Sequence, residues 1–136
     1  MNTKELGDLG EKLACEYLVE KGFNILGRNW RISFGEIDII ARKKWRLFPL
    51  FPRAARPIHF VEVKALKQSS FQPIFPEQHV DFRKQRKLRQ LAQIWLNKNK
   101  LPQNTPYQID IAGILVNEET RNAKLHYFPN AVADNQ

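Results

Sequence analysis

The chain of 136 residues is long enough for one folded domain with its own core. Hydrophobic residues make up 43% of it and charged residues 26%, which is typical of a globular domain and excludes a low-complexity chain. Lysine and arginine outnumber aspartate and glutamate by 22 to 14, so the formal charge is +8 and the pI is near 9.8. This charge favours a polyanionic partner, nucleic acid first and an anionic membrane surface second, although many small domains are basic without binding either.

The single cysteine, Cys15, excludes an internal disulfide framework and a zinc site built from several cysteines, and it fits a reducing compartment. Residues 1–8 are polar and lack the apolar run of a signal peptide. No apolar run in the sequence approaches the length needed to span a bilayer. We therefore expect a cytoplasmic protein with no membrane partner.

The first predicted element is an amphipathic helix over residues 4–21. Its apolar residues recur at helical spacing and are Leu6, Leu9, Leu13 and Tyr17. Thr3 is the predicted N-cap, and Gly22 is the predicted stop.

Three predicted strands follow, over residues 23–30, 36–41 and 58–64, because these segments are rich in β-branched and aromatic residues. The stretch at about 43–57 is basic, aromatic and contains three prolines, which exclude a long helix or a central strand. It is too long for a tight turn, so we predict an inserted, exposed loop. Residues 68–79 form a second irregular stretch.

A second helix is predicted by a full apolar stripe, consisting of Leu88, Leu91, Ala92, Trp95 and Leu96. Strands at 107–116 and 124–128 follow it, and the tail after residue 129 is expected to be frayed. The order is thus α-β-β-β-α-β-β. It predicts a single α/β domain over 1–136, with a mixed β-sheet flanked by helices.

The strands at 36–41 and 58–64 carry the residues most suited to chemistry. Alternation along the first of them predicts one face with Glu36, Asp38 and Ile40, and the other with Ile37, Ile39 and Ala41. On the other strand, Glu62 and Lys64 point the same way. If the two strands pair, Asp38 lies beside Glu62.

Charged groups on the inside of apolar strands are costly unless they neutralise one another or hold an ion. Asp38 and Glu62 would offer carboxylates to Mg²⁺ or Mn²⁺, and the Val63 carbonyl would add another oxygen. Lys64 would lower the pKa of a metal-bound water, orient that water, or stabilise charge on the reacting phosphate. Glu-x-Lys by itself is a weak pattern, and alone it favours a structural ion pair or solvent-facing charges.

Three further residues have two interpretations each. Glu11 lies at the edge of the first helix's buried stripe, near the small Gly7 and Ala14, so it either reaches an active site or is a solvated carboxylate. Lys84 faces the sheet and either extends to solvent or meets a carboxylate or phosphate. Asp110 is either a buried helper or the partner of an arginine.

A basic face is predicted on the second helix, with further cations elsewhere in the chain. The candidate nucleic-acid contacts are Arg83, Lys84, Arg86, Lys87, Arg31 and Arg46. A solvated charged face is the usual alternative for such a run. The net charge favours nucleic acid.

Four segments occur in an order that resembles the YraN-type family of small predicted endonucleases. They are GEKLA at 10–14, NWR at 29–31, GEIDIIA at 35–41 and FVEVK at 60–64, and the likeness continues through Lys84 and Asp110. The resemblance implies a restriction-endonuclease-like fold, similar to that of archaeal Holliday-junction resolvases. It also implies cleavage of DNA, with branched or junction DNA among the substrates, and a homodimer would suit such cleavage.

Carried over position by position, the catalytic residues implied by the resemblance are Glu11, Asp38, Glu62 and Lys64, with Glu36 and Asp110 as supporting groups. The chain departs from the family pattern at Leu66 and Gln108, where basic residues are usual, and in its longer insertion. Two alternatives to a nuclease stay open: a non-catalytic nucleic-acid-binding module of the same fold, or a protein-interaction domain that docks through the apolar side chains at 45–51.

Overall fold

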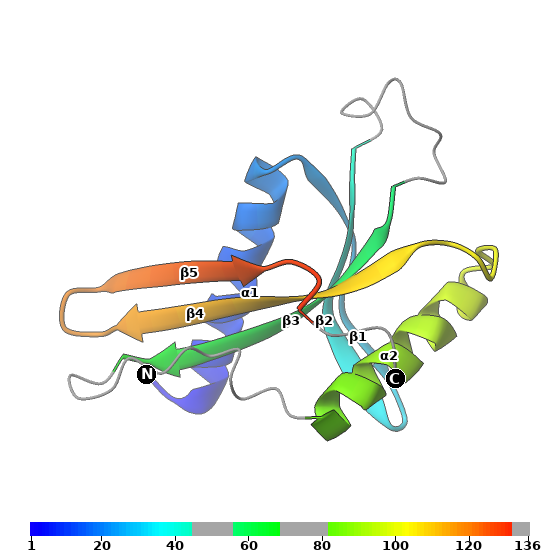
Figure 1. The fold of residues 1–136 in the computed structure, drawn as a ribbon. Helices are drawn as coiled ribbons and strands as arrows, with labels where there is room; N and C mark the ends of the chain where they lie inside the picture. Colours follow the sequence, from blue (N-terminus) through cyan, green and yellow to red (C-terminus); the bar gives the residue numbers. More distant parts are fainter. Residues whose placement is uncertain (45–55, 69–81, 132–136) are drawn as a thin grey trace.

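The computed structural model describes residues 1–44, 56–68 and 82–131, which form two helices and one sheet (Figure 1). The elements in chain order are α1 (Thr3–Glu20), β1 (Phe23–Ile32), β2 (Gly35–Lys43), β3 (Ile58–Lys67), α2 (Phe82–Lys98), β4 (Tyr107–Asn117) and β5 (Asn122–Phe128). The predicted α/β class and the predicted order of elements are confirmed. No helix in these ranges is long and apolar enough to cross a membrane.

The strands form one mixed sheet in the order β1-β2-β3-β4-β5. β3 and β4 are parallel, and every other neighbouring pair is antiparallel. The parallel connection from β3 to β4 passes through α2, as such crossovers usually do. The long register between β3 and β4, from Ile58↔Tyr107 to Lys67↔Val116, makes this pair the rigid centre of the sheet.

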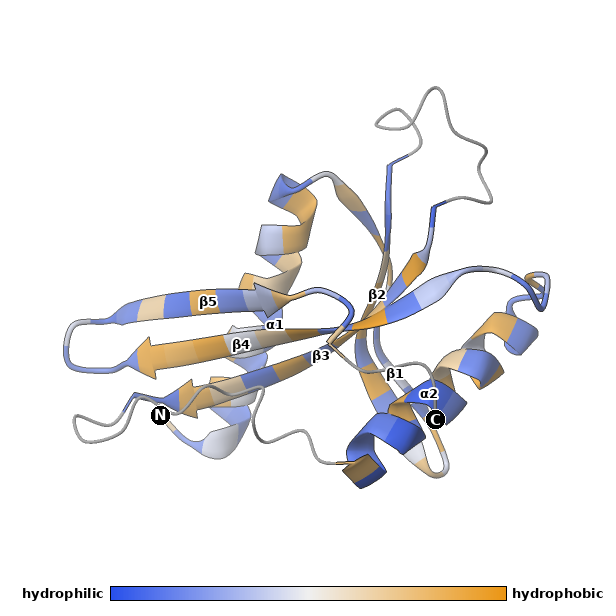
Figure 2. Ribbon diagram, viewed as in Figure 1, coloured by the Kyte–Doolittle hydropathy of each residue, from blue (hydrophilic) through white to orange (hydrophobic). Residues whose placement is uncertain are grey.

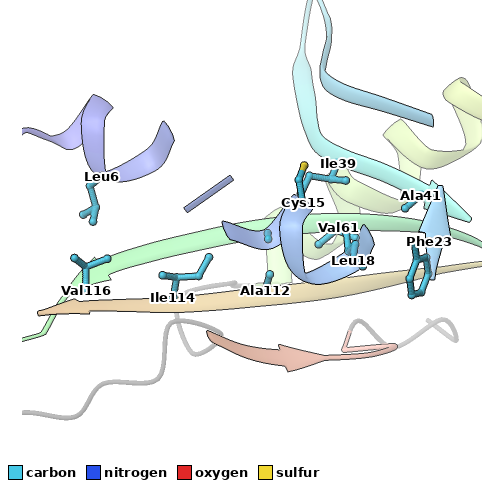
Figure 3. Close-up of a cluster of buried hydrophobic side chains, with 11 residues drawn as sticks. Leu6, Cys15, Leu18, Phe23, Ile39, Ala41, Val61, Ala112, Ile114 and Val116 are labelled. Carbon is cyan, nitrogen blue, oxygen red and sulfur yellow. The ribbon is translucent and has the colours of Figure 1, made fainter. Parts of the chain in front are cut away.

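The two helices cover opposite faces of the sheet, and each buries its own hydrophobic cluster. The cluster under α1 contains Leu6, Ala14, Cys15, Leu18, Phe23, Ile39, Ala41, Val61, Ala112, Ile114 and Val116 (Figure 3). The cluster under α2 contains Ile37, Ile40, Ile58, Phe60, Leu88, Leu91, Ala92, Trp95, Leu96 and Ile109. Apolar residues run along β4, which is buried for most of its length. Along the edge strand β5, apolar and polar residues alternate (Figure 2).

Helix α1 begins and ends on local signals. Asn2, and not the predicted Thr3, is its N-cap, because the Asn2 side chain accepts a hydrogen bond from the Glu5 amide at 2.8 Å. Thr3 is the first helical residue. Gly22 ends the helix as predicted, at a left-handed φ of 93° that glycine adopts without strain.

The alternation predicted for β2 is wrong at one point, because it breaks between Ile37 and Ile39. Ile39 packs under α1 as expected, but Ile37 packs under α2 together with Ile40. Asn29 lies opposite this break, between the pairs Arg28↔Ile39 and Trp30↔Ile37, and has a left-handed φ of 50°. Asparagine tolerates that conformation better than most residues, so the β1–β2 hairpin bends here and its faces change.

The predicted inserted loop lies mostly outside the described residues, since 45–55 are not among them. Its C-terminal end is not exposed as expected. Arg56 is buried, its guanidinium donates to the Lys43 carbonyl at 2.6 Å, and the Arg42 guanidinium donates to the Arg56 carbonyl at 3.0 Å. These hydrogen bonds join the ends of β2 and β3. Residues 69–79 of the second irregular stretch, together with residues 80 and 81, also lie outside the described residues.

The tail expected to fray after residue 129 is held for its next two residues. The Asn130 amide donates to the Asp110 side chain at 2.7 Å, and the Ala131 amide donates to the Ile109 carbonyl at 2.9 Å. These bonds use backbone donors that a frayed tail would leave to water. Residues 132–136 lie outside the described part.

Helix α1 packs tightly against β3 at Gly10. A Cβ built on Gly10 would lie 2.8 Å from the Ala65 Cβ and 3.3 Å from the Val63 Cγ1, while a Cβ on Gly7 would meet nothing within 4 Å. Gly10 therefore sets the distance between the helix and the strand that carries Glu62 and Lys64.

We predict that Gly10→Ala destabilises the protein by about 1–3 kcal/mol, because the added methyl forces α1 away from β3. The matched variant Gly7→Ala should stabilise it by up to about 1 kcal/mol, since alanine is the better helix former and the site is open. Urea denaturation of both variants measures the difference. Equal effects of the two substitutions would contradict the close approach at Gly10.

Candidate active site

The candidate site lies where β2 and β3 stop pairing. Their antiparallel register consists of Ala41↔His59, Ile40↔Phe60 and Ile39↔Val61, and it ends there. The Asp38 carboxylate then takes the place of a backbone acceptor, because the Val63 amide donates to Asp38 Oδ2 at 2.8 Å. The amide and carbonyl of one strand residue project to the same edge, so the Val63 carbonyl also faces Asp38.

Glu62 and Lys64 stand on the α2 face of β3, one pleat apart. Glu62 Oε1 lies 3.2 Å from Lys84 Nζ on α2, which fixes the direction of the Glu62 side chain. Val63 and Ala65 pack under α1, so Lys64 shares the face of Glu62 by alternation. The prediction that Glu62 and Lys64 point the same way agrees with this arrangement.

Burial and like charge raise the pKa of both central carboxyls. Burial raises the pKa of Asp38 from 3.8 to about 7, and the negative charge of Glu62 adds to the increase, against the hydrogen bond from Val63. Burial also raises the pKa of Glu62, although the positive charges of Lys84 and Lys64 oppose that change. The Glu62 charge is therefore close enough to Asp38 to affect the ionisation of that carboxyl.

Glu11 and Glu36 lie within electrostatic range of the same pair. The charge of Glu11, half-buried on α1, raises the pKa of Asp38, and the charge of Glu36 raises the pKa of both Asp38 and Glu62. Glu11 follows Gly10, so the close contact of α1 with β3 brings it there. Glu36 also forms an ion pair with Arg31 at 2.7 Å.

The oxygen donors of the site suit a hard divalent cation. Mg²⁺ is usually held by one or two carboxylates together with waters and substrate phosphate, and Asp38, Glu62 and the Val63 carbonyl are donors of that kind. Within the described residues, no group of three or more His, Cys, Asp or Glu side chains is arranged to hold a metal alone. The protein would thus supply part of the coordination shell and leave the rest to water or substrate.

The candidate nucleic-acid contacts occupy three different settings. Arg83, Arg86 and Lys87 are exposed on α2, with the Arg86 guanidinium 5.1 Å from the centre of the Phe82 ring. Lys84 pairs with Glu62, and Arg31, 71% exposed, pairs with Glu36. Arg46 lies outside the described residues.

Comparison of the chain with known proteins identifies its family. Residues 10–114 match an uncharacterised protein family, UPF0102. The chain belongs to the UPF0102 family. A UPF0102 protein of Dictyoglomus turgidum is 38% identical over 131 residues, which cover 96% of this chain and 99% of that protein. A UPF0102 protein of Clostridioides difficile is 37% identical over 128 residues, covering 94% and 100%.

The matched region of this UPF0102 chain runs from Gly10 to Ile114 and so contains every described carboxylate of the candidate site. A UPF0102 protein of Roseiflexus castenholzii is 33% identical over 129 residues, which are 95% of this chain and 94% of that protein. These relatives are similar in length as well as in sequence. The family description names no activity.

Asp110 does not join the candidate site in this UPF0102 chain. It is fully buried on the α1 face of the sheet, and its partners there are His59 Nδ1 at 2.6 Å, the Tyr127 hydroxyl, the Gln108 amide at 2.9 Å and the Asn130 backbone amide at 2.7 Å. Burial alone would raise the pKa of Asp110, but these hydrogen bonds hold it below its ordinary value.

The position of Asp110 differs from the expectation of a supporting role or an arginine partner. Gln108 stands where the family resemblance implies a basic residue, and it contacts Asp110 in place of an arginine. Sequence reasoning missed His59 and Tyr127 as partners. The parallel register of β3 and β4 pairs Val61 with Asp110 and His59 with Gln108. His59 lies two residues before Val61 and so on the same face as Asp110, and this register would have identified it as a partner.

We predict that the thermal stability of the metal-free protein depends on pH through Asp38. The folded-state pKa of Asp38, about 7, is above the ordinary value of 3.8, so its stabilising contribution is complete below the ordinary pKa and is lost as the pH rises through about 7. Asp38→Asn keeps an acceptor for Val63 and removes the charge. In EDTA at about pH 8 it should melt several degrees above the wild type.

The matched control is Asp8→Asn, because Asp8 is an exposed α1 carboxylate that pairs with Lys4 on the same helix at 2.8 Å. Melting curves from about pH 5 to about pH 8 should be parallel for Asp8→Asn and the wild type. If Asp38→Asn gives the same pH dependence as the wild type, the raised pKa is wrong.

Proposed function

We propose that the chain is a divalent-metal-dependent endonuclease that hydrolyses phosphodiester bonds of DNA. The observation that carries the proposal is the hydrogen bond from the Val63 amide to Asp38, which brings the Asp38 carboxylate beside Glu62 and Lys64. The resemblance to the YraN-type endonucleases supports it, because two of the four segments, GEIDIIA and FVEVK, supply these residues.

Asp38 and Glu62 are the proposed ligands of Mg²⁺ or Mn²⁺, with the Val63 carbonyl as a further oxygen donor. When bound, such an ion polarises a phosphoryl oxygen and lowers the pKa of a coordinated water. Glu11 adds a third carboxylate at the edge of the site, where it would orient that water. These roles need both Asp38 and Glu62 to be ionised.

Lys64 is the proposed partner of the reacting phosphate. It shares the α2 face with Glu62, and its charge already acts on that carboxylate. An ammonium held there on a paired strand would stabilise the negative charge that grows on the phosphate oxygens in the transition state. The strand fixes its position before substrate arrives.

The basic residues of α2 are the proposed contacts to the DNA backbone. Arg83, Arg86 and Lys87 are exposed on the helix that also carries Lys84 next to the site. Backbone contacts of this kind make affinity fall steeply with salt. Branched DNA as the substrate and a two-fold dimer belong to the same proposal, because paired cuts at a junction need two related sites.

The second candidate function is a nucleic-acid-binding module without cleavage. It is favoured by the ion pair of Glu62 with Lys84, because a carboxylate neutralised by the protein's own lysine needs no metal. This module would bind DNA independently of Mg²⁺ and of Asp38. The apolar side chains at 45–51, through which a protein-interaction domain would dock, lie outside the described residues.

We predict that Lys64→Met lowers the rate of DNA cleavage by about 100-fold or more, because a cation next to the transition-state charge is lost. Cleavage should be measured with Mg²⁺ and with Mn²⁺ on labelled single-stranded, duplex, flapped and four-way-junction DNA. DNA affinity in the same buffer should change little, since the α2 contacts remain.

Lys67→Met is the matched control, because Lys67 is the exposed last residue of the same strand and pairs with Glu118 away from the site. It should cut at the wild-type rate. Cleavage by Lys64→Met at the rate of Lys67→Met would exclude the proposed site. If wild type cuts none of these substrates but binds them equally with and without divalent ions, the binding module is correct.

A further inference from the structure

The ion pair between Glu62 and Lys84 joins a carboxylate with little solvent exposure to an ammonium that is far more exposed. The Glu62 side chain is 11% exposed and belongs to β3, which is paired along its length with β4. The Lys84 side chain is 41% exposed and reaches Glu62 from α2, on the other layer. The carboxylate is therefore fixed, whereas the ammonium sits at the end of a flexible stem that solvent can reach.

The position that Lys84 occupies conflicts with a second cation on the same carboxylate. Lys84 Nζ is 3.2 Å from Glu62 Oε1, so a divalent ion bound by Asp38 and Glu62 would lie within a few ångströms of the ammonium. Like charges at such a separation repel strongly in a partly buried site. Lys84 can relieve this by turning outward, because its stem is exposed.

Three exposed cationic residues lie on the helix that carries Lys84. Arg83, Arg86 and Lys87 are exposed on the same helix. A DNA phosphate bound among these residues would attract all four cationic side chains. A phosphate thus replaces the carboxylate as the partner of Lys84.

We propose that Lys84 is an exchangeable positioning residue: it neutralises Glu62 while no divalent ion is bound and moves to a phosphate of the nucleic acid when one is. This inference rests on the proposed function and adds its regulation. The exchange couples the two ligands. Because DNA draws Lys84 away from Glu62, DNA raises the affinity for the ion, and by linkage the ion raises the affinity for DNA to the same extent.

Ca²⁺ is the probe for the test, since it takes carboxylate and carbonyl oxygens. Its affinity is measured by titration calorimetry at about pH 8, with and without a short DNA duplex. For wild type we expect DNA to tighten Ca²⁺ binding on the order of tenfold. Lys84→Met should bind Ca²⁺ more tightly than wild type without DNA, and DNA should add nothing further.

Two further variants separate the exchange from a simple loss of charge. Lys98→Met removes the same charge from the last turn of α2, where Lys98 is exposed, and should leave both the Ca²⁺ affinity and its response to DNA at wild-type values. Lys84→Arg keeps a cation that pairs with Glu62 more rigidly, so Ca²⁺ should bind no tighter than to wild type. Melting curves establish that each variant is folded.

The outcomes distinguish this inference from the proposed function. If wild type binds Ca²⁺ and Lys84→Met binds it equally or more weakly, the exchange is wrong and the metal site stands. The exchange is also wrong if the response to DNA survives in Lys84→Met. Wild type that binds no Ca²⁺ with or without DNA would overturn the metal site and the exchange together.

Discussion

The candidate site depends on one hydrogen bond, from the Val63 amide to the Asp38 carboxylate. It replaces the next rung of the β2–β3 ladder with a side chain, so the two strands separate after Ile39↔Val61 without leaving that amide unsatisfied. The left-handed Asn29 lies on β1 opposite Asp38, where the side chains of β2 change faces. A regular ladder would have pointed Asp38 away from β3 or buried it without a donor, and Glu62 would have stood alone.

Like charge is the constraint that this geometry creates. Asp38 is buried, Glu62 is only 11% exposed, and the charges of Glu62, Glu11 and Glu36 all act against ionisation of Asp38. Burying charges without sufficient compensation costs stability, and such clusters concentrate at functional sites. Asp110 shows the opposite arrangement, because four donors stabilise its charge and lower its pKa while it anchors the tail. Asp110 has four hydrogen-bond donors, whereas Asp38 accepts a hydrogen bond from one backbone amide, and this contrast separates the structural face of the sheet from the candidate site.

The order of helices and strands could be predicted from the sequence, because the spacing of apolar residues shows which face of each element is buried. The adjacency of Asp38 and Glu62 followed from alternation plus the assumption that their strands pair. Other features depend on contacts that spacing does not encode. The break between Ile37 and Ile39 lies opposite the left-handed Asn29 and beside the Asp38 carboxylate that accepts from Val63, and the tight contact of α1 with β3 falls at Gly10. The burial of Asp110 with His59 needs the β3–β4 register, which follows the long connection through α2.

β3 unites these features, because its two faces serve different ends. His59, Val61 and Val63 pack under α1, whereas Glu62 and Lys64 face α2. Since β4 holds the whole strand in parallel register, none of these groups can move far without breaking the sheet. Any adjustment to an arriving ion or phosphate has to come from the other partners, and Lys84 is the one that joins a fixed carboxylate to an accessible helix. In the proposed exchange, the paired strand would hold Glu62 in place while Lys84 changes its partner from this carboxylate to a phosphate.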